Sequence, residues 1–235
     1  MGKIFRDATP EQEQAFIEER RKSAFVDACK SPFRWLYSAR HHKRAADILY
    51  EIAYTAHQRE MARMVKEMER IRAEMAKQGL SSPSESRTLE GEELSDSLDS
   101  ELLGDYLLLA GYALECVLKA CLLAMRPELV KDDKKLDNLV LTHNLAKLCD
   151  NCAIVVSPQE RYLLDIMTWH SDWGRYLVPK DLKDMPSPVD PTPISPYAVS
   201  AFHNRHEKTT VDRLYESGCA LLETLRQSKT QPGPQ

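Results

Sequence analysis

One helix-like stretch, residues 101–126, carries the polar groups best placed to do chemistry. At about 100° of rotation per residue, one narrow stripe of this otherwise apolar run holds Asp105, Tyr112, Glu115 and Lys119. An unpaired charge on a buried helix costs several kcal/mol, so the stripe requires partners. Glu115 and Lys119, four residues apart, either pair with each other at a wet groove or face a ligand site or a partner chain.

Two later segments supply groups that could meet this stripe. His143 follows Thr142 and is expected in the first turn of a helix, where it could bond to the backbone or to the glutamate. Arg175, followed by Tyr176, can form paired hydrogen bonds with a carboxylate or a phosphate. Two interpretations stay open: an internal polar network, or a groove in which Arg175, Lys119 and His143 bind a nucleotide or an RNA phosphate.

A basic segment, residues 30–44, offers a different chemistry, because it holds five basic residues, two histidines and no acid. A histidine as general base and an arginine as electrostatic stabiliser would act on a phosphodiester. The residues in these roles would be Arg34, His41 and His42, beside a basic patch formed by Arg40, Lys43 and Arg44.

No metal or cofactor site is expected. Cys149 and Cys152 form a single CxxC pair, whereas a structural zinc site normally combines two ligand pairs. Both fall on an expected helix that Leu145 and Leu148 would anchor to the core, which favours buried, reduced thiols. The glycines are scattered singly and form no phosphate-binding loop.

Long helices must position these residues, and the fold is expected to be all-α. Apolar spacing predicts a first helix over residues 10–29. A second helix is expected to start after Ser31, which caps it, and to run to residue 78. The outer half of this second helix shows the alternating three- and four-residue spacing of a heptad seam. We interpret it as a protruding helix or a dimer contact; a solvated single helix is the alternative. The seam residues are Met61, Met64, Met68, Ile71 and Met75.

The other segments are expected to complete an antiparallel four- to five-helix bundle. Residues 1–30 form an N-terminal extension, 31–78 the first bundle helix with its heptad extension, 79–100 a flexible acidic linker, and 101–228 the rest of the bundle. Asp99 or Ser100 is expected to cap the helix after the linker. Further helices are expected over 142–153, 158–170 and up to 227, with a proline-rich loop at 179–196 and a disordered tail at 229–235.

Composition favours a soluble globular protein: of 235 residues, 43% are hydrophobic and 29% are charged, with a net charge of −4. Residues 1–78 carry 16 basic and 12 acidic side chains, so the basic character is local and does not indicate a protein that coats nucleic acid.

The chain opens without a signal-peptide pattern, and the charges within 101–126 argue against a membrane span. Six cysteines in such a chain are expected to be reduced, which indicates the cytoplasm.

Four short segments, in this order, resemble the HEPN family of small helical-bundle domains. They lie at residues 32–35, 111–120, 142–148 and 173–176, and the resemblance covers residues 33–56 and 101–226. It implies a dimeric bundle that acts in bacterial stress, toxin–antitoxin or phage-defence systems, and many members are metal-independent RNases. The family's RNase motif, an arginine and a histidine with four to six residues between them late in the fold, is not found; that spacing occurs at Arg34 and His41, on the first helix.

Three hypotheses for the function follow. The first is a non-catalytic or degenerate HEPN-like protein that forms a homodimer and binds a partner protein, a nucleotide or RNA. The second is a metal-independent endoribonuclease of toxin–antitoxin or defence type, whose catalytic groups have moved to the first long helix. The third is a coiled-coil interaction protein whose active part is residues 54–78.

Overall fold

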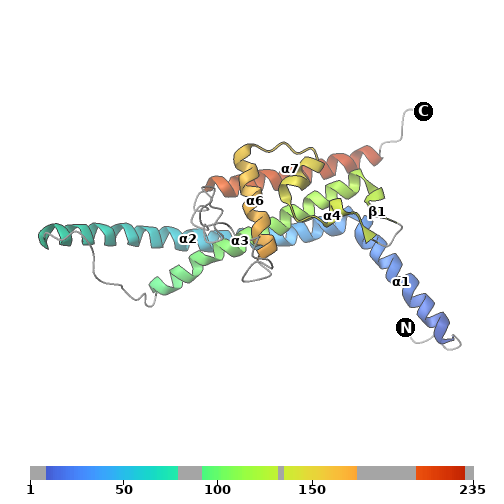
Figure 1. The fold of residues 1–235 in the computed structure, drawn as a ribbon, viewed down its shortest axis with the longest axis horizontal. Coiled ribbons are helices and arrows are strands. Elements are labelled where there is room, and N and C mark those ends of the chain that lie inside the picture. Colours follow the sequence, from blue (N-terminus) through green and yellow to red (C-terminus); the bar gives the residue numbers. More distant parts are fainter. Residues whose placement is uncertain (1–8, 79–91, 132–134, 174–204, 231–235) are drawn as a thin grey trace.

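The computed structural model describes residues 9–78, 92–131, 135–173 and 205–230. Its long helices are α1 (Pro10–Lys30), α2 (Pro32–Gln78), α3 (Glu92–Met125), α6 (Pro158–Trp173) and α7 (Arg205–Thr230). Its short helical elements are η1 (Pro127–Leu129), α4 (Asn138–Leu141) and α5 (Leu145–Asn151). The all-α prediction is confirmed. Figure 1 shows α2 and α7 running along α3, whereas α6 crosses them, which departs from a regular antiparallel bundle.

The helix α3 is the element around which the others pack, because α2, α5, α6 and α7 all contact it. Its largest fully buried side chains are Leu103, Leu107, Leu114, Leu118 and Leu122. Each such leucine contributes roughly 1.5–3 kcal/mol through burial. The part of α3 from Leu102 to Met125 is long and apolar enough to cross a membrane, and 78% of its most apolar stretch is buried inside the protein.

Small side chains bring α2 close to α3. Ala39, Ala46 and Ala53 are spaced seven residues apart on α2 and are fully buried. Next to them, the ring of Tyr50 lies 5.0 Å from the ring of Tyr106 on α3. The alanine repeat therefore forms the inner face of α2, and it is part of the apolar spacing that predicted this helix.

Several predicted helix boundaries are confirmed. The first helix and the long second helix are separated at Ser31, and α2 continues without a break for 47 residues. At the start of α6, the predicted capping box is present: the backbone N–H of Ser157 donates to Glu160 at 2.8 Å, and the N–H of Glu160 donates to the Ser157 hydroxyl at 3.3 Å.

Other predictions were wrong. α3 begins at Glu92, so the last nine residues of the predicted linker are helical and neither Asp99 nor Ser100 caps a helix. Leu98 and Leu102, four residues apart, continue the helical apolar spacing into the acidic segment, although Leu98 itself is exposed. A two-residue antiparallel pair was also missed, between β1 (Val130–Lys131) and β2 (Lys135–Leu136).

Parts of three predicted segments lie outside the described residues. These are residues 79–91 of the acidic linker, the proline-rich loop 179–196, and residues 231–235 of the tail. The last helix begins at Arg205 and ends at Thr230, three residues beyond its predicted end, so the first two residues of the predicted tail are helical.

Close packing between α7 and α3 depends on Gly218. A Cβ atom at this position would lie 3.0 Å from a methyl group of Val117 on α3. The backbone carbonyl of Gly218 also accepts a hydrogen bond of 3.1 Å from the Cys121 thiol. Gly104, on α3, has the opposite surroundings, because an added Cβ there would meet nothing within 4 Å.

We therefore expect opposite effects at the two glycines. Gly218→Val should lower the free energy of unfolding by about 1–3 kcal/mol, because its side chain must displace Val117. Gly104→Ala should raise it by roughly 0.5–1 kcal/mol, because alanine restricts the unfolded chain and favours helix. Urea unfolding followed by circular dichroism, at one protein concentration, measures both. Equal effects at the two positions would contradict the packing of α7 on α3.

Candidate functional site

The structure brings three of the predicted polar residues together at the middle of α3. Nζ of Lys119 lies 2.6 Å from one carboxylate oxygen of Glu115, and Nδ1 of His143 lies 3.1 Å from the other. The side chains of Lys119 and Glu115 are only 5% and 10% exposed, whereas that of His143 is 39% exposed. The ion pair of Glu115 and Lys119 is therefore buried rather than solvated, and His143 lies between it and the solvent.

Two elements position these groups. Glu115 and Lys119 share a face of α3, while His143 lies in the turn between α4 and α5. The expectation that His143 lies within the first turn of a helix was wrong, because Asn144 is the N-cap of α5 and its side chain accepts the N–H of Lys147 at 2.8 Å. Placed before the cap, His143 points back to α3 and links this turn to the core.

Aromatic rings of α2 and α3 enclose the same region. Nζ of Lys119 lies 5.9 Å from the centre of the Trp35 ring, a cation–π contact. The ring of His42 lies 5.6 Å from that of Tyr112. Burial lowers the pKa of His42, and the neighbouring His41 lowers it further, while Glu115 opposes both. The cation–π contact was not predicted, although Trp35 lies in the first of the four segments that carry the HEPN resemblance.

The arrangement supports a structural clamp. Both oxygens of Glu115 are engaged, and Lys119 is held by a carboxylate and an indole. A buried ion pair with such partners connects the α4–α5 turn, α3 and α2 through one set of contacts. The other two residues predicted for this network, Arg175 and Tyr176, lie outside the described residues.

The alternative catalytic residues all lie on α2, and their side chains have different surroundings. Arg34 and His41 are exposed on α2, and the ring of His41 lies 4.3 Å from that of Tyr37 on the same helix. His42 turns toward Tyr112 on α3 instead. The rings of the two adjacent histidines therefore have different aromatic neighbours, although His41 is close enough to lower the pKa of His42.

The predicted basic patch is partly neutralised. Nζ of Lys43 lies 2.7 Å from carboxylate oxygens of both Asp47 and Asp212, and Lys208 contacts the same two acids at 3.1 and 2.8 Å. Burial would raise the pKa of Asp212, but Lys208 and Lys43 hold it below its usual range. Lys43 is thus part of an α2–α7 ion network rather than a cation for a ligand, because two acids outside the basic segment reach it.

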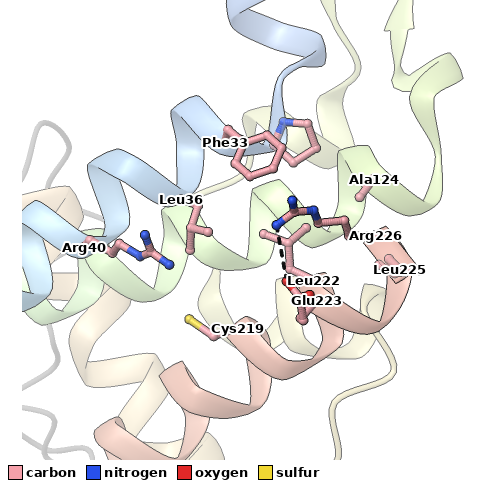
Figure 2. A pocket seen from close by; sticks show the side chains of 10 residues that line it. Phe33, Leu36, Arg40, Ala124, Cys219, Leu222, Glu223, Leu225 and Arg226 are labelled. Atoms are coloured by element: carbon pink, nitrogen blue, oxygen red, sulfur yellow. Dashed lines mark ion pairs between the residues drawn. The ribbon is translucent and has the colours of Figure 1, made fainter. Parts of the chain in front are cut away.

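The remaining members of that patch, Arg40 and Arg44, are exposed. Arg40 borders a feature that sequence reasoning missed, a groove of about 560 Å³ between the N-terminal turns of α2 and the C-terminal turns of α7. Figure 2 shows Phe33, Leu36 and Arg40 reaching into it from α2. No sequence signal marks this groove, because it arises from how two distant helices pack on α3.

The methionine seam is exposed over much of its length. The exposed fractions of Met61, Met64 and Met68 are 38%, 49% and 48%, and Val65 beside them is 50% exposed. In Figure 1 this part of α2 extends beyond the packed helices. The structure thus agrees with a protruding helix, while Ile71 and Met75 farther out are half-buried.

The cysteines offer no exposed reactive thiol in the CxxC segment. Cys149 and Cys152 are buried, and burial raises their pKa to about 12 and about 11. All six cysteines of the chain are free. In the described part of the chain, no group of three or more histidine, cysteine or acidic side chains is arranged to hold a metal ion.

The clamp can be tested by a double-mutant cycle. Glu115→Leu or Lys119→Met alone should lower the free energy of unfolding by about 3–5 kcal/mol, because each leaves one buried charge without its partner. The double variant should recover most of this loss, since both charges are gone. Urea unfolding of the four proteins gives the coupling. Additive losses would show that the two charges act separately and would contradict the clamp.

Comparison with known proteins assigns no family to the chain. No protein-family model, no curated protein and no solved structure matches it. Its function must therefore be inferred from the clamp, the seam and the groove described above.

Proposed function

We propose that this protein is a non-catalytic helical interaction module that pairs with a second copy of itself through the outer half of α2. One observation carries the proposal: the heptad seam that begins at Met61 is apolar and exposed along its first two turns. A continuous apolar stripe in solvent is typical of a surface that another chain covers.

The spacing of the seam favours a helical partner with the same repeat. Residues 61, 64, 68, 71 and 75 occupy the a and d positions of consecutive heptads, the positions that interdigitate in a coiled coil. Methionine packs adaptably at such positions. A second copy of α2 supplies a matching seam of equal length.

The flanking charges favour a parallel pair. All three g positions of the seam are glutamates, Glu60, Glu67 and Glu74, whereas Arg72 occupies an e position. In a parallel pair Glu67 of one copy faces Arg72 of the other, while an antiparallel pair would place glutamate against glutamate. Glu67 also bonds to Arg70 on its own helix at 2.7 Å. Exposed ion pairs of this kind are weak, so exchanging one for another costs little.

The polar clamp supports a non-catalytic role. Its carboxylate and ammonium groups satisfy each other, and His41 and His42 of α2 contact different aromatic rings. The endoribonuclease alternative needs converging groups, and no observation favours it. Membership in the HEPN family, a stress or defence role, and binding of RNA or a nucleotide stay proposals that rest on the four sequence segments. A cytoplasmic location is proposed on the free cysteines.

Charge on the seam should break self-association. The wild-type protein should sediment as a dimer, and Met64→Glu/Met68→Glu should sediment as a monomer, because four like charges would meet in the paired seam. Ala62→Glu/Ala73→Glu adds the same charges at b and f positions that are exposed on α2, so it should remain a dimer. Sedimentation velocity over a concentration series measures this. A monomeric wild type, or a dimeric seam variant, would contradict the proposal.

The purified protein should leave total cellular RNA intact. If cleavage occurs, His41→Ala/His42→Ala decides its origin, because these are the general bases of the enzyme alternative. Cleavage by the wild type that this double variant abolishes would overturn the non-catalytic proposal. Cleavage that the variant retains would indicate a contaminating nuclease, and intact RNA with a folded protein agrees with the interaction module.

A further inference from the structure

The groove between α2 and α7 has the position and the volume expected of a small-molecule site. Both helices pack on α3. At one end an ion network of Lys43, Asp47, Lys208 and Asp212 joins them, and the groove lies toward the other end. Its volume of about 560 Å³ falls in the range that small-molecule pockets occupy.

The walls of the groove are mainly apolar. Phe33 and Leu36 line it from α2, Leu222 and Leu225 from α7, and Ala124 from the end of α3. Phe33 is 60% exposed, so a large aromatic ring at the edge of the groove is left in water. A ligand with an aliphatic body would cover that ring and the leucines, which is favourable by the hydrophobic effect.

Charge distinguishes the two ends. At the outer end, Arg226 lies 3.8 Å from Glu223 and 5.3 Å from the centre of the Phe33 ring, so this cation is already balanced. At the inner end, Arg40 reaches into the groove toward Cys219 (Figure 2). Among the described residues, no carboxylate pairs with Arg40. A ligand's anionic group is therefore favoured at the inner end and its tail at the outer end.

The length of the groove limits the ligand. Phe33 and Arg40 are seven residues apart on α2, which corresponds to about 10 Å along a helix. Cys219 and Arg226, which line the opposite wall, have the same spacing on α7. An acyl chain of about eight to ten carbons spans this distance.

From this geometry we infer that the groove binds a medium-chain aliphatic monocarboxylate, with its carboxylate on Arg40 and its chain between Phe33, Leu36 and Leu222. An arginine and a carboxylate form a charge-assisted pair, and the apolar walls exclude water from the chain. This site is separate from the seam on the outer half of α2, so it does not depend on self-association.

Decanoate and octanoate, below the concentrations at which they form micelles, are the probes. Isothermal titration calorimetry with the full chain measures the affinity. Cys219 provides a local readout, because it lines the groove, while Cys116 on α3 is also partly exposed but lies outside it. Alkylation of the two thiols by iodoacetamide, followed by peptide mass spectrometry, should show decanoate slowing the reaction of Cys219 and leaving that of Cys116 unchanged.

Matched variants distinguish the contact between the carboxylate and Arg40 from non-specific hydrophobic binding. Arg40→Gln should weaken decanoate binding about tenfold, whereas Arg34→Gln, at an exposed position of α2 outside the groove, should have no effect. Phe33→Ala should weaken binding, and Tyr37→Ala, which also removes an exposed ring of α2, should not. Circular dichroism confirms that each variant is folded.

The outcomes are decisive in both directions. Binding of decanoate with selective protection of Cys219 and loss of affinity in Arg40→Gln supports the site. Three results would each overturn it: no binding, equal binding of decyltrimethylammonium, which carries the opposite charge, or equal protection of Cys116 and Cys219. None of these results depends on whether the protein is a monomer or a dimer.

Discussion

The ion pair between Glu115 and Lys119 is the constraint on which the rest of the structure depends. The second half of α3 is buried on nearly every side, so Glu115 and Lys119 cannot reach water and must be satisfied inside the protein, whereas Asp105 nearer its start is exposed. Their partners fix the neighbouring elements: His143 ties the α4–α5 turn to the pair, and Trp35 brings the start of α2 over the ammonium group. A helix that serves as the hub of the core thus also orients the two segments beside it.

The same helix α2 lies in two environments, and this contrast leads to the proposed function. Its inner half buries an alanine repeat against α3, whereas its outer half leaves methionines in solvent. Apolar burial stabilises the inner half within one chain, but the outer half lacks equivalent cover on its first turns. Pairing with a second copy would bury that stripe, and the proposed interaction surface is therefore separate from both the clamp and the groove.

Much of the fold could be predicted from the sequence, because local signals specify it. Ser31 with Pro32, and Ser157 with Glu160, mark helix starts that the structure contains. The ion pair of Glu115 and Lys119 follows from their spacing. The features that could not be predicted depend on contacts between distant parts of the chain. Lys43 is neutralised by Asp212, which lies more than 160 positions later, and the groove forms between α2 and α7. The predicted start of α3 was too late, because the acidic residues of its first turns have the composition of a flexible linker.

Parallel pairing of α2 can be measured by disulfide trapping. Met75 occupies an a position, so Met75→Cys would place the two introduced thiols next to each other only in a parallel pair in register. Ala73, at an f position on the outside of the pair, serves as the matched site. Under mild oxidation, Met75→Cys should give a covalent dimer that a reductant reverses, and Ala73→Cys should not. Equal crosslinking of the two variants, or no crosslinking of either, would contradict the account.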